Sequence, residues 1–200
     1  MVISEEILKQ YNSSYLSFKK DEYIFYEDDQ PHHYYQVIKG TVKMSSFSSN
    51  GQEFTQGIFK EGQCFGEPAI FGNFNYPNNA IAMEESVVAK LPADVFLTML
   101  KENFEIHLKF NQIMSHRLRY KAILLKEISS YCPDHIIMTF LKYVRDNSGQ
   151  KANGQFFIPY TRQQIADMTG LRVETVIRTV KQLSKERRLE IKDHKIYLGS

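Results

Sequence analysis

The sequence predicts an α+β protein: a β-rich first half, then a long helix, then a winged helix-turn-helix. Short segments rich in β-forming residues, separated by turn residues, run as far as Pro92. From Ala93 to Ile128 the chain lacks Gly and Pro and repeats apolar residues at intervals of three and four. The C-terminal part has helix-turn-helix spacing. We therefore expect a β-domain at residues 1–103, a helix and hinge at 104–132, and a winged helix-turn-helix at 133–200.

The strands of the first half are rich in Tyr, Phe, Val and Ile. We predict them at Ser17–Tyr26, Tyr34–Lys39, Thr41–Ser46, Phe54–Phe59, Ala80–Met83 and Ser86–Pro92. Turn-forming pairs separate them, among them Lys39-Gly40, Asn50-Gly51 and Glu61-Gly62. Many short strands joined by regular turns favour a sandwich, a jelly roll or a barrel.

The helix predicted at Phe104–Ile128 carries two apolar stripes, one with Ile106, Phe110, Ile113, Tyr120 and Leu124, the other with Met114, Leu118, Leu125 and Ile128. Two stripes need two packing partners. We expect one partner to be the β-domain and the other a second copy of the chain in a homodimer. Burial of the whole helix inside a monomer is the alternative. The expected dimer interface comprises Phe110, Met114, Leu118, Leu125 and Ile128.

The stretch from Tyr160 to Leu183 predicts two short packed helices. Thr161 and Gln164 fit a capping box at the start of the first helix, and Gly170 fits its end. A shared core is predicted from Ile165, Leu171, Val176, Val180 and Leu183. The second helix exposes Arg172, Glu174, Thr175 and Arg178, where DNA base edges would be read. The alternating Leu189–Leu198 predicts a basic β-wing. A pair of packed helices with a solvated charged face is the competing interpretation.

Composition and charge narrow the class of protein. Hydrophobic residues make up 42% and charged residues 24% of the 200 residues, as in an ordinary globular chain. Residues 1–104 hold 8 basic and 14 acidic side chains, whereas residues 155–200 hold 9 and 5. This asymmetry favours a polyanionic partner for the second half. The chain has no membrane-length apolar run and no signal peptide, and Cys64 and Cys132 lie far apart, so we expect a cytoplasmic protein without a metal or disulfide framework.

The whole chain resembles the Crp/Fnr superfamily of transcription regulators, the cyclic-AMP receptor protein and its relatives. The residues that carry the resemblance are Thr161–Ala166, Gly170–Arg178, Lys39-Gly40, Asn50-Gly51, Glu61-Gly62 and Phe65-Gly66-Glu67. The resemblance implies an N-terminal β-roll of the cyclic-nucleotide-binding type, which is a double-stranded jelly roll, then a dimerisation helix and a winged helix-turn-helix. It also implies a homodimer, palindromic double-stranded DNA sites and RNA polymerase as a partner.

Family roles carry over to the DNA-facing positions. The Arg that matches Arg162 holds a phosphate, and Glu174 and Arg178 fall on base-reading positions. Their chemistry agrees, because Glu accepts from cytosine N4 and Arg donates to guanine O6 and N7. The motif Val173–Arg178 is closer to the oxygen-sensing fumarate–nitrate branch of the family than to the cyclic-AMP branch. Val173 stands where the cyclic-AMP receptor has Arg. The full set of expected DNA contacts is Arg162, Gln163, Arg172, Val173, Glu174, Thr175, Arg178 and Lys181.

The effector pocket departs from the family pattern. The family's Phe-Gly-Glu is kept at Phe65-Gly66-Glu67, but its Arg-Ser-Ala, where Arg neutralises the cyclic phosphate, is replaced by Asn78-Asn79-Ala80. Lys121 stands at an adenine-contacting position on the long helix and is the one residue expected to rescue an anionic ligand. Phe71, Phe74 and Tyr76 could fill the space. We therefore expect that cyclic AMP is not the signal, and the effector stays unknown. The expected pocket comprises Gly66, Glu67, Pro68, Asn78, Asn79, Ala80 and Lys121.

The leading interpretation is a DNA-binding transcription regulator and not an enzyme. One alternative is a β-roll ligand-binding module that acts through protein partners, with a vestigial DNA domain. The other is a cupin-like metalloenzyme, which would need a His-x-His set with a nearby Glu. The adjacent His32 and His33 do not supply that set, because neighbouring side chains on an extended chain point apart.

Overall fold

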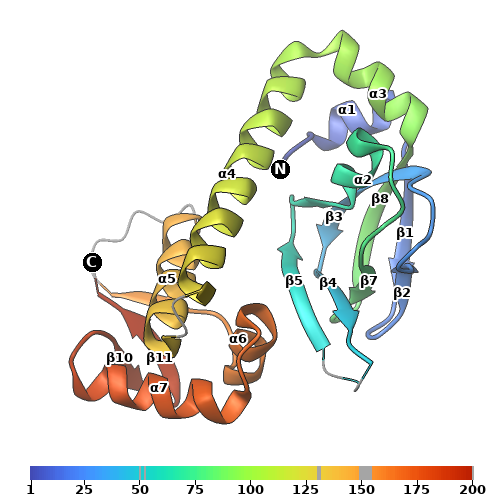
Figure 1. The fold of residues 1–200 in the computed structure, drawn as a ribbon. Helices are drawn as coiled ribbons and strands as arrows, with labels where there is room; N and C mark the ends of the chain where they lie inside the picture. Colours follow the sequence, from blue (N-terminus) through green and yellow to red (C-terminus); the bar gives the residue numbers. More distant parts are fainter. Residues whose placement is uncertain (50, 52, 130–131, 149–154, 200) are drawn as a thin grey trace. The chain divides into compact units, whose positions relative to one another are not determined.

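The computed structural model describes residues 1–49, 51, 53–129, 132–148 and 155–199, with the side chains of 127–129 left aside (Figure 1). The chain divides into two compact units, Met1–Ile113 and Met114–Ser200, and each is considered by itself. The predicted turn at Asn50-Gly51 lies partly outside the described residues, because Asn50 is among those left out. No helix in the described ranges is long and apolar enough to cross a membrane.

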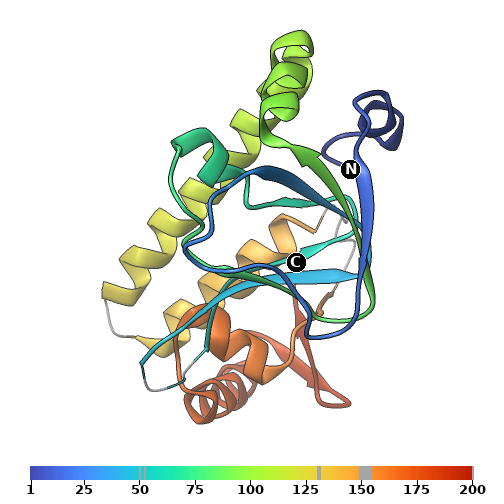
Figure 2. The same cartoon turned by 90° about the vertical axis from the view of Figure 1, so that its right-hand side faces the viewer.

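Two four-stranded antiparallel sheets form the first unit and confirm the predicted jelly-roll class. One sheet has the order β1-β8-β3-β6 and the other β2-β7-β4-β5. Figure 2 shows the strands wrapping around a common interior. The strands are β1 Ser14–Phe18, β2 Tyr23–Phe25, β3 His33–Lys39, β4 Thr41–Phe47, β5 Glu53–Lys60, β6 Cys64–Phe65, β7 Asn79–Ala82 and β8 Ser86–Pro92.

The strand predicted at Ser17–Tyr26 is wrong as a single element. It is two strands, because β1 pairs with β8 and β2 pairs with β7 in the other sheet. Between them Asp21 takes a left-handed backbone with φ 67°, and the backbone N–H of Lys19 donates to Glu22 Oε2 at 2.7 Å. The short polar turn therefore carries the chain from one sheet to the other. The alternation of apolar and polar residues in the sequence does not reveal this turn.

The helices of the first unit are α1 Glu5–Gln10, α2 Glu67–Gly72, α3 Ala93–Glu102 and the start of α4 Phe104–Ser129. The predicted long helix is confirmed as α4. The Gly- and Pro-free stretch nevertheless breaks at Asn103, whose side-chain amide donates to the Met99 carbonyl at 2.9 Å. This bond satisfies a carbonyl at the end of α3 and separates that helix from α4.

The second unit contains the predicted winged helix-turn-helix. After the rest of α4 come α5 Pro133–Asp146, β9 Phe156–Ile158, α6 Arg162–Thr169, α7 Val173–Lys185, β10 Glu190–Lys192 and β11 Lys195–Leu198. The three strands form one antiparallel sheet in the order β10-β11-β9. The core joins Ile137, Phe140 and Leu141 of α5 to Ile165 of α6 and to the buried side of α7. The helices that carry the candidate site thus rest on a continuous apolar base.

Candidate nucleic-acid interface

The first helix of the helix-turn-helix is fixed at both ends by the predicted signals. At its start, the backbone N–H of Gln164 donates to Thr161 Oγ1 at 3.1 Å, and the backbone N–H of Thr161 donates to Gln164 Oε1 at 2.8 Å. This reciprocal pair confirms the capping box. At its end, Gly170 takes the left-handed conformation with φ 72°, which costs a residue without Cβ little. These caps set where α7 begins.

Helix α7 has one buried side and one exposed side. Val176, Thr179, Val180 and Leu183 are buried against the rest of the unit. Six residues of the exposed side line an open depression of about 530 Å³, which we call the α7 depression: Glu174, Ile177, Arg178, Lys181, Gln182 and Lys185. They follow the three- and four-residue spacing of one helix face.

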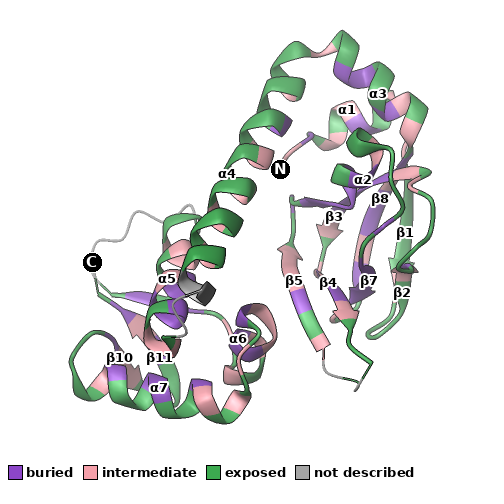
Figure 3. Ribbon diagram, viewed as in Figure 1, coloured by how far each residue is buried: buried purple, intermediate pink, exposed green. Residues whose placement is uncertain are grey.

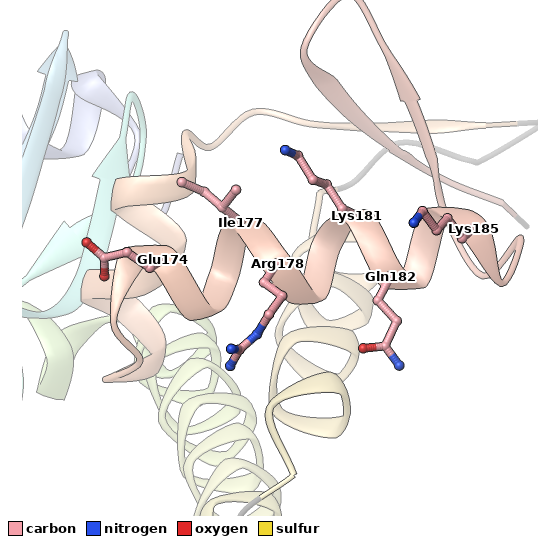
Figure 4. A pocket seen from close by; sticks show the side chains of 6 residues that line it. All are labelled: Glu174, Ile177, Arg178, Lys181, Gln182 and Lys185. Carbon is pink, nitrogen blue, oxygen red and sulfur yellow. The ribbon is translucent and has the colours of Figure 1, made fainter.

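The α7 depression lies between two rows of side chains. Figure 4 shows Ile177 and Lys181 projecting to one side of the helix, and Arg178 and Gln182 to the other. Within the described part of the chain, Arg178, Lys181 and Lys185 form no ion pair, whereas Gln182 Nε2 donates to Glu186 Oε1 at 2.9 Å. Three cations that have no ion-pair partner among the described residues, together with one carboxylate, therefore line this exposed side of the helix.

Three of the eight expected DNA contacts lie in the α7 depression, namely Glu174, Arg178 and Lys181. Arg172 is exposed at the N-cap of α7, whereas Val173 is half-buried and packs on the core. Sequence reasoning missed Ile177, Gln182 and Lys185. Continuing the helical spacing by three and four residues from Glu174, Arg178 and Lys181 would have found all three.

Of the remaining contacts, Thr175 is half-buried on α7 and Gln163 is exposed on α6, where its amide donates to Asp167 Oδ1 at 2.7 Å. Arg162 holds the wing, since its guanidinium Nη1 donates to the backbone carbonyl of His194 in the turn between β10 and β11. Partial burial lowers the pKa of the Arg162 guanidinium from its ordinary value, although an arginine remains charged at neutral pH. Arg162 thus joins the start of α6 to the wing.

Aromatic rings fill the interior of the β-roll. The rings of Phe25 and Tyr76 stack at 3.7 Å between centroids, with Tyr35 and Phe65 beside them. Tyr76 is buried as expected, whereas Phe71 and Phe74 are 41% and 47% exposed. Burial raises the pKa of the Tyr35 phenol to about 12 and also raises that of Tyr76. Both phenols stay neutral at physiological pH, so the rings add no charge to the interior.

The expected pocket residues other than Lys121 belong to the first unit, as the aromatic cluster does. Glu67, directly after Gly66 and before the exposed Pro68, is buried, and its Oε1 accepts a hydrogen bond from Cys64 Sγ at 3.2 Å. Gly66 has φ 80°, and an added Cβ would lie 3.1 Å from the Tyr76 ring. The close approach of glycine and ring leaves no space between them.

The asparagines that replace the family's Arg and Ser are buried and uncharged. Asn79 Oδ1 accepts from the Glu27 backbone N–H at 3.0 Å, and its amide donates to the Ser45 carbonyl at 3.3 Å. Among the described residues, Asn78 Oδ1 has no hydrogen-bond partner. Ala80 is buried in the aromatic cluster. Lys121 is exposed on the part of α4 that belongs to the second unit, and its role stays a prediction.

The long helix exposes apolar side chains. Leu118 and Leu125 are 70% and 69% exposed, and Met114 is half-buried (Figure 3 shows the exposure along α4). Phe110 requires a correction: it is 1% exposed and packs edge-on against Tyr34 and Phe96. It has no surface left for a partner, so it does not belong to the interface. The side chain of Ile128 lies outside the described residues.

Potential metal ligands do not cluster in the described part of the chain. Among the described residues, no group of three or more His, Cys, Asp and Glu side chains could hold a metal ion. His32 is exposed, and His33 is half-buried, with the pKa of its imidazole lowered by burial and by the nearby Lys90 ammonium. Nothing in these residues favours the cupin interpretation.

Comparisons with known proteins match both units. Residues 15–103 match the model of the cyclic nucleotide-binding domain family, and residues 135–198 match that of the Crp-like helix-turn-helix domain. The fumarate and nitrate reduction regulatory protein of Yersinia pestis is 23% identical over 176 residues, covering 87% of this chain and 70% of the relative. The transcriptional activator protein Anr of Pseudomonas protegens is 27% identical over 164 residues, covering 80% and 66%.

Solved structures agree on the fold. The structure of FixK2 from Bradyrhizobium japonicum superposes with a TM-score of 0.73 at 22% identity, and the alignment covers 93% of this chain and 92% of that one. At this identity the likeness shows the architecture alone. A β-roll, a long helix and a helix-turn-helix in this order are therefore shared with this solved structure.

Proposed function

Because the chain belongs to the Crp/Fnr superfamily of DNA-binding transcription regulators, we propose that it binds palindromic operators as a homodimer and that cyclic AMP is not its effector. The single observation that carries the DNA-binding part is the α7 depression, which presents three cations and one carboxylate on a helix held by a helix-turn-helix core. No catalytic role is needed for this function, and the relatives named above are regulators. A cytoplasmic location follows, because the DNA to be bound lies there.

Readout is assigned to Glu174 and Arg178 on the α7 depression. In the major groove, an arginine donates two hydrogen bonds to guanine O6 and N7, and a glutamate accepts from cytosine N4. The two residues lie four positions apart, one turn along the helix, so one C·G pair or two neighbouring pairs come within their reach. Lys181 and Lys185 continue the face and are assigned to phosphates. Arg172, exposed at the N-cap, is assigned to the same backbone.

The wing supplies a second contact with the sugar–phosphate backbone. Lys192 and Lys195 are exposed on β10 and β11, on either side of the turn that Arg162 holds. Arg162 therefore serves the interface in two ways, because one N–H of its guanidinium fixes the wing and the others remain for a phosphate. Such contacts position the protein without selecting a sequence.

Dimerisation is assigned to α4 through Met114, Leu118 and Leu125. Two leucines about 70% exposed on one long helix gain free energy when they are buried against a second copy, because each buried leucine contributes roughly 1.5–3 kcal/mol. A two-fold axis through this helix places two copies of α7 for two half-sites, and this supports a palindromic operator. RNA polymerase is the further partner we propose by analogy with the family.

Exclusion of cyclic AMP rests on charge and space. A cyclic phosphate buried in the β-roll would need a cation, since an unpaired buried charge is very costly. Asn78 and Asn79 are neutral, and the stacked rings of Phe25 and Tyr76 occupy the interior. The effector, if there is one, is therefore of another chemical class.

The test is selection of duplexes from a random library by the full-length chain, followed by titration at two salt concentrations. We expect a palindrome whose affinity falls steeply with salt, because the contacts to phosphates release counterions. Binding that does not depend on sequence, or no binding, would favour the alternative of a ligand-binding module with a vestigial DNA domain.

A further inference from the structure

Two stacked tyrosines join the long helix α4 to the helix-turn-helix. The rings of Tyr120 on α4 and Tyr143 on α5 lie 3.6 Å apart between centroids, and their planes are 16° from parallel. Both side chains are half-buried. The sequence predicts that the stripe with Tyr120 packs on the β-domain, whereas this ring lies on α5. The contact therefore connects α4 to the helices of the second unit.

Tyr120 is the point at which α4 meets the core of the second unit. Among the hydrophobic side chains of α4 that the structure describes, it is the one that packs against that core. Its stacking partner belongs to α5, whose buried side supplies Phe140 and Leu141 to the core shared with α6 and α7. The position of the helix-turn-helix on α4 therefore depends on this ring.

The stack is apolar and has a defined orientation. Burial raises the pKa of the Tyr120 phenol and that of the Tyr143 phenol. Both rings are therefore uncharged at physiological pH. Aromatic pairs also prefer particular orientations, so a stack fixes the angle between two helices as well as their separation.

The other side of α4 carries the proposed dimer contact. Leu118 and Leu125 are exposed, and the helical repeat places both roughly opposite to Tyr120. One helix would therefore hold the second copy on one side and its own helix-turn-helix on the other. In such a dimer, the distance and the angle between the two copies of α7 follow from these two contacts.

A palindromic operator requires a fixed relation between two reading helices. The half-sites lie about 34 Å apart, which is one turn of the duplex. One base pair added between them moves a half-site by about 3.4 Å and rotates it by about a tenth of a turn around the duplex axis. A dimer with rigidly held helix-turn-helix units therefore binds one spacing, whereas loosely held units adapt to several.

We propose that Tyr120 is a positioning residue that sets the spacing between the two half-sites, because its stack on Tyr143 holds the helix-turn-helix at one orientation on α4. This inference rests on the proposed function, since it requires a dimer that reads two half-sites. It assigns no base contact to Tyr120. The preference for each base within a half-site should therefore not depend on this residue.

The experiment titrates the full-length chain with the selected operator and with versions whose spacer is one or two base pairs shorter or longer. For the wild type we expect one preferred spacing and a steep loss of affinity on either side. Tyr120→Leu keeps an apolar side chain but loses the ring, so it should bind the preferred spacing roughly two- to tenfold more weakly. Its affinity should then vary little across the spacings. Tyr120→Phe keeps the ring and should retain the wild-type profile.

Two further variants separate positioning from general stability. Tyr143→Leu removes the other ring of the stack and should broaden the spacing profile in the same way. Tyr197→Leu is the matched control, because it removes a half-buried tyrosine ring of the same unit that packs beside Phe157 in the wing sheet. It should keep the wild-type spacing preference. Discrimination between single-base variants of one half-site should be the same in all these proteins, which verifies that the helix-turn-helix is folded.

The inference is overturned if Tyr120→Leu and Tyr143→Leu keep the wild-type spacing preference, or if Tyr197→Leu loses it to the same extent. Loss of base discrimination in both stack variants would also overturn it, because the rings would then only hold the unit together. A wild type that binds a palindrome at every spacing contradicts this inference alone. A wild type that binds no palindrome contradicts the proposed function as well.

Discussion

At the scale of single residues, we assign the reading of sequence to Arg178 and the binding of phosphate to Lys181. Both side chains are exposed and line the α7 depression. Figure 4 shows that they project from opposite sides of the helix, Arg178 in one row and Lys181 in the other. They carry the same charge, so the difference between them lies in what each would contact. This makes them a matched pair for mutation.

We predict that Arg178→Ala costs roughly 1–3 kcal/mol of affinity for the selected operator and relaxes the preference at one base pair. Lys181→Ala should lower affinity for all duplexes alike and reduce the salt slope by about one. Binding titrations with the operator and with single-base variants measure both effects. Equal losses from the two variants on every duplex would contradict the assignment of Arg178.

Arg162 gives a second prediction at this scale. Arg162→Ala removes the donor to the His194 carbonyl, so the wing turn should open more often, at a cost of about 1 kcal/mol. Amide hydrogen exchange around Asp193 and His194 should then be faster. Arg172→Ala is the control, because it removes an equal charge at the N-cap of α7 and should leave the wing unchanged. Identical exchange in all three proteins would mean that Arg162 does not hold the wing.

Single residues also show where sequence reasoning succeeds and where it stops. Thr161, Gln164 and Gly170 act through contacts within four residues, so their roles in capping α6 were predictable. Phe110 was assigned to a partner but lies in the β-roll core, because the direction of one side chain depends on tertiary packing. The roles proposed for the exposed site residues depend on contacts outside the chain, which no local sequence signal defines.

At the scale of elements, α4 is the helix through which we propose that two chains assemble. Its exposed leucines follow a spacing of seven residues, so Leu118 and Leu125 lie on one face. His116 is also exposed, and its side chain lies on the opposite side of the helix from those of both leucines. The helix therefore offers its own control position for a test of the interface.

We predict that Leu118→Glu and Leu125→Glu give monomers that bind the operator weakly, whereas His116→Glu stays dimeric. The reason is that a carboxylate placed in an apolar interface loses its hydration without gaining a partner. Sedimentation at micromolar concentration measures the assembly state. A wild-type monomer under these conditions would contradict the proposed dimer.

Elements were predictable where their signals are local and periodic. The helix predicted at Phe104–Ile128 agrees with α4, and the wing predicted at Leu189–Leu198 agrees with β10 and β11. The segment Ser17–Tyr26 is divided between two sheets. The sheet that each strand joins is determined by its pairing with strands that are distant in the sequence. The short α2 begins with a left-handed Gly66 and a buried Glu67, which carry little signal of a helix.

At the scale of the whole molecule, the two units differ in charge and in task. Acidic side chains exceed basic ones in residues 1–104, and basic exceed acidic in 155–200. The β-roll interior is aromatic and holds neutral asparagines where the family pattern has a cation. These features support the proposal that the chain keeps the DNA-binding design of its family and senses a signal other than cyclic AMP.

We predict that cyclic AMP and cyclic GMP bind no more tightly than about millimolar, which corresponds to about −4 kcal/mol. DNA affinity should be the same with and without either nucleotide. Calorimetry and operator titrations measure these quantities. Micromolar cyclic-AMP binding would show that the phosphate finds a cation, and Lys121→Ala would then identify whether the Lys121 ammonium supplies it.

Footprinting of the full-length chain on its selected operator tests most directly whether two copies of α7 read two symmetric half-sites. We predict two equal protected regions whose centres lie about 34 Å, or one helical turn of DNA, apart, with one dimer bound per duplex. Leu118→Glu should protect neither half-site at the concentration that saturates the wild type. A single asymmetric protected region, bound by one chain and unaffected by Leu118→Glu, would contradict a dimer that reads a palindrome.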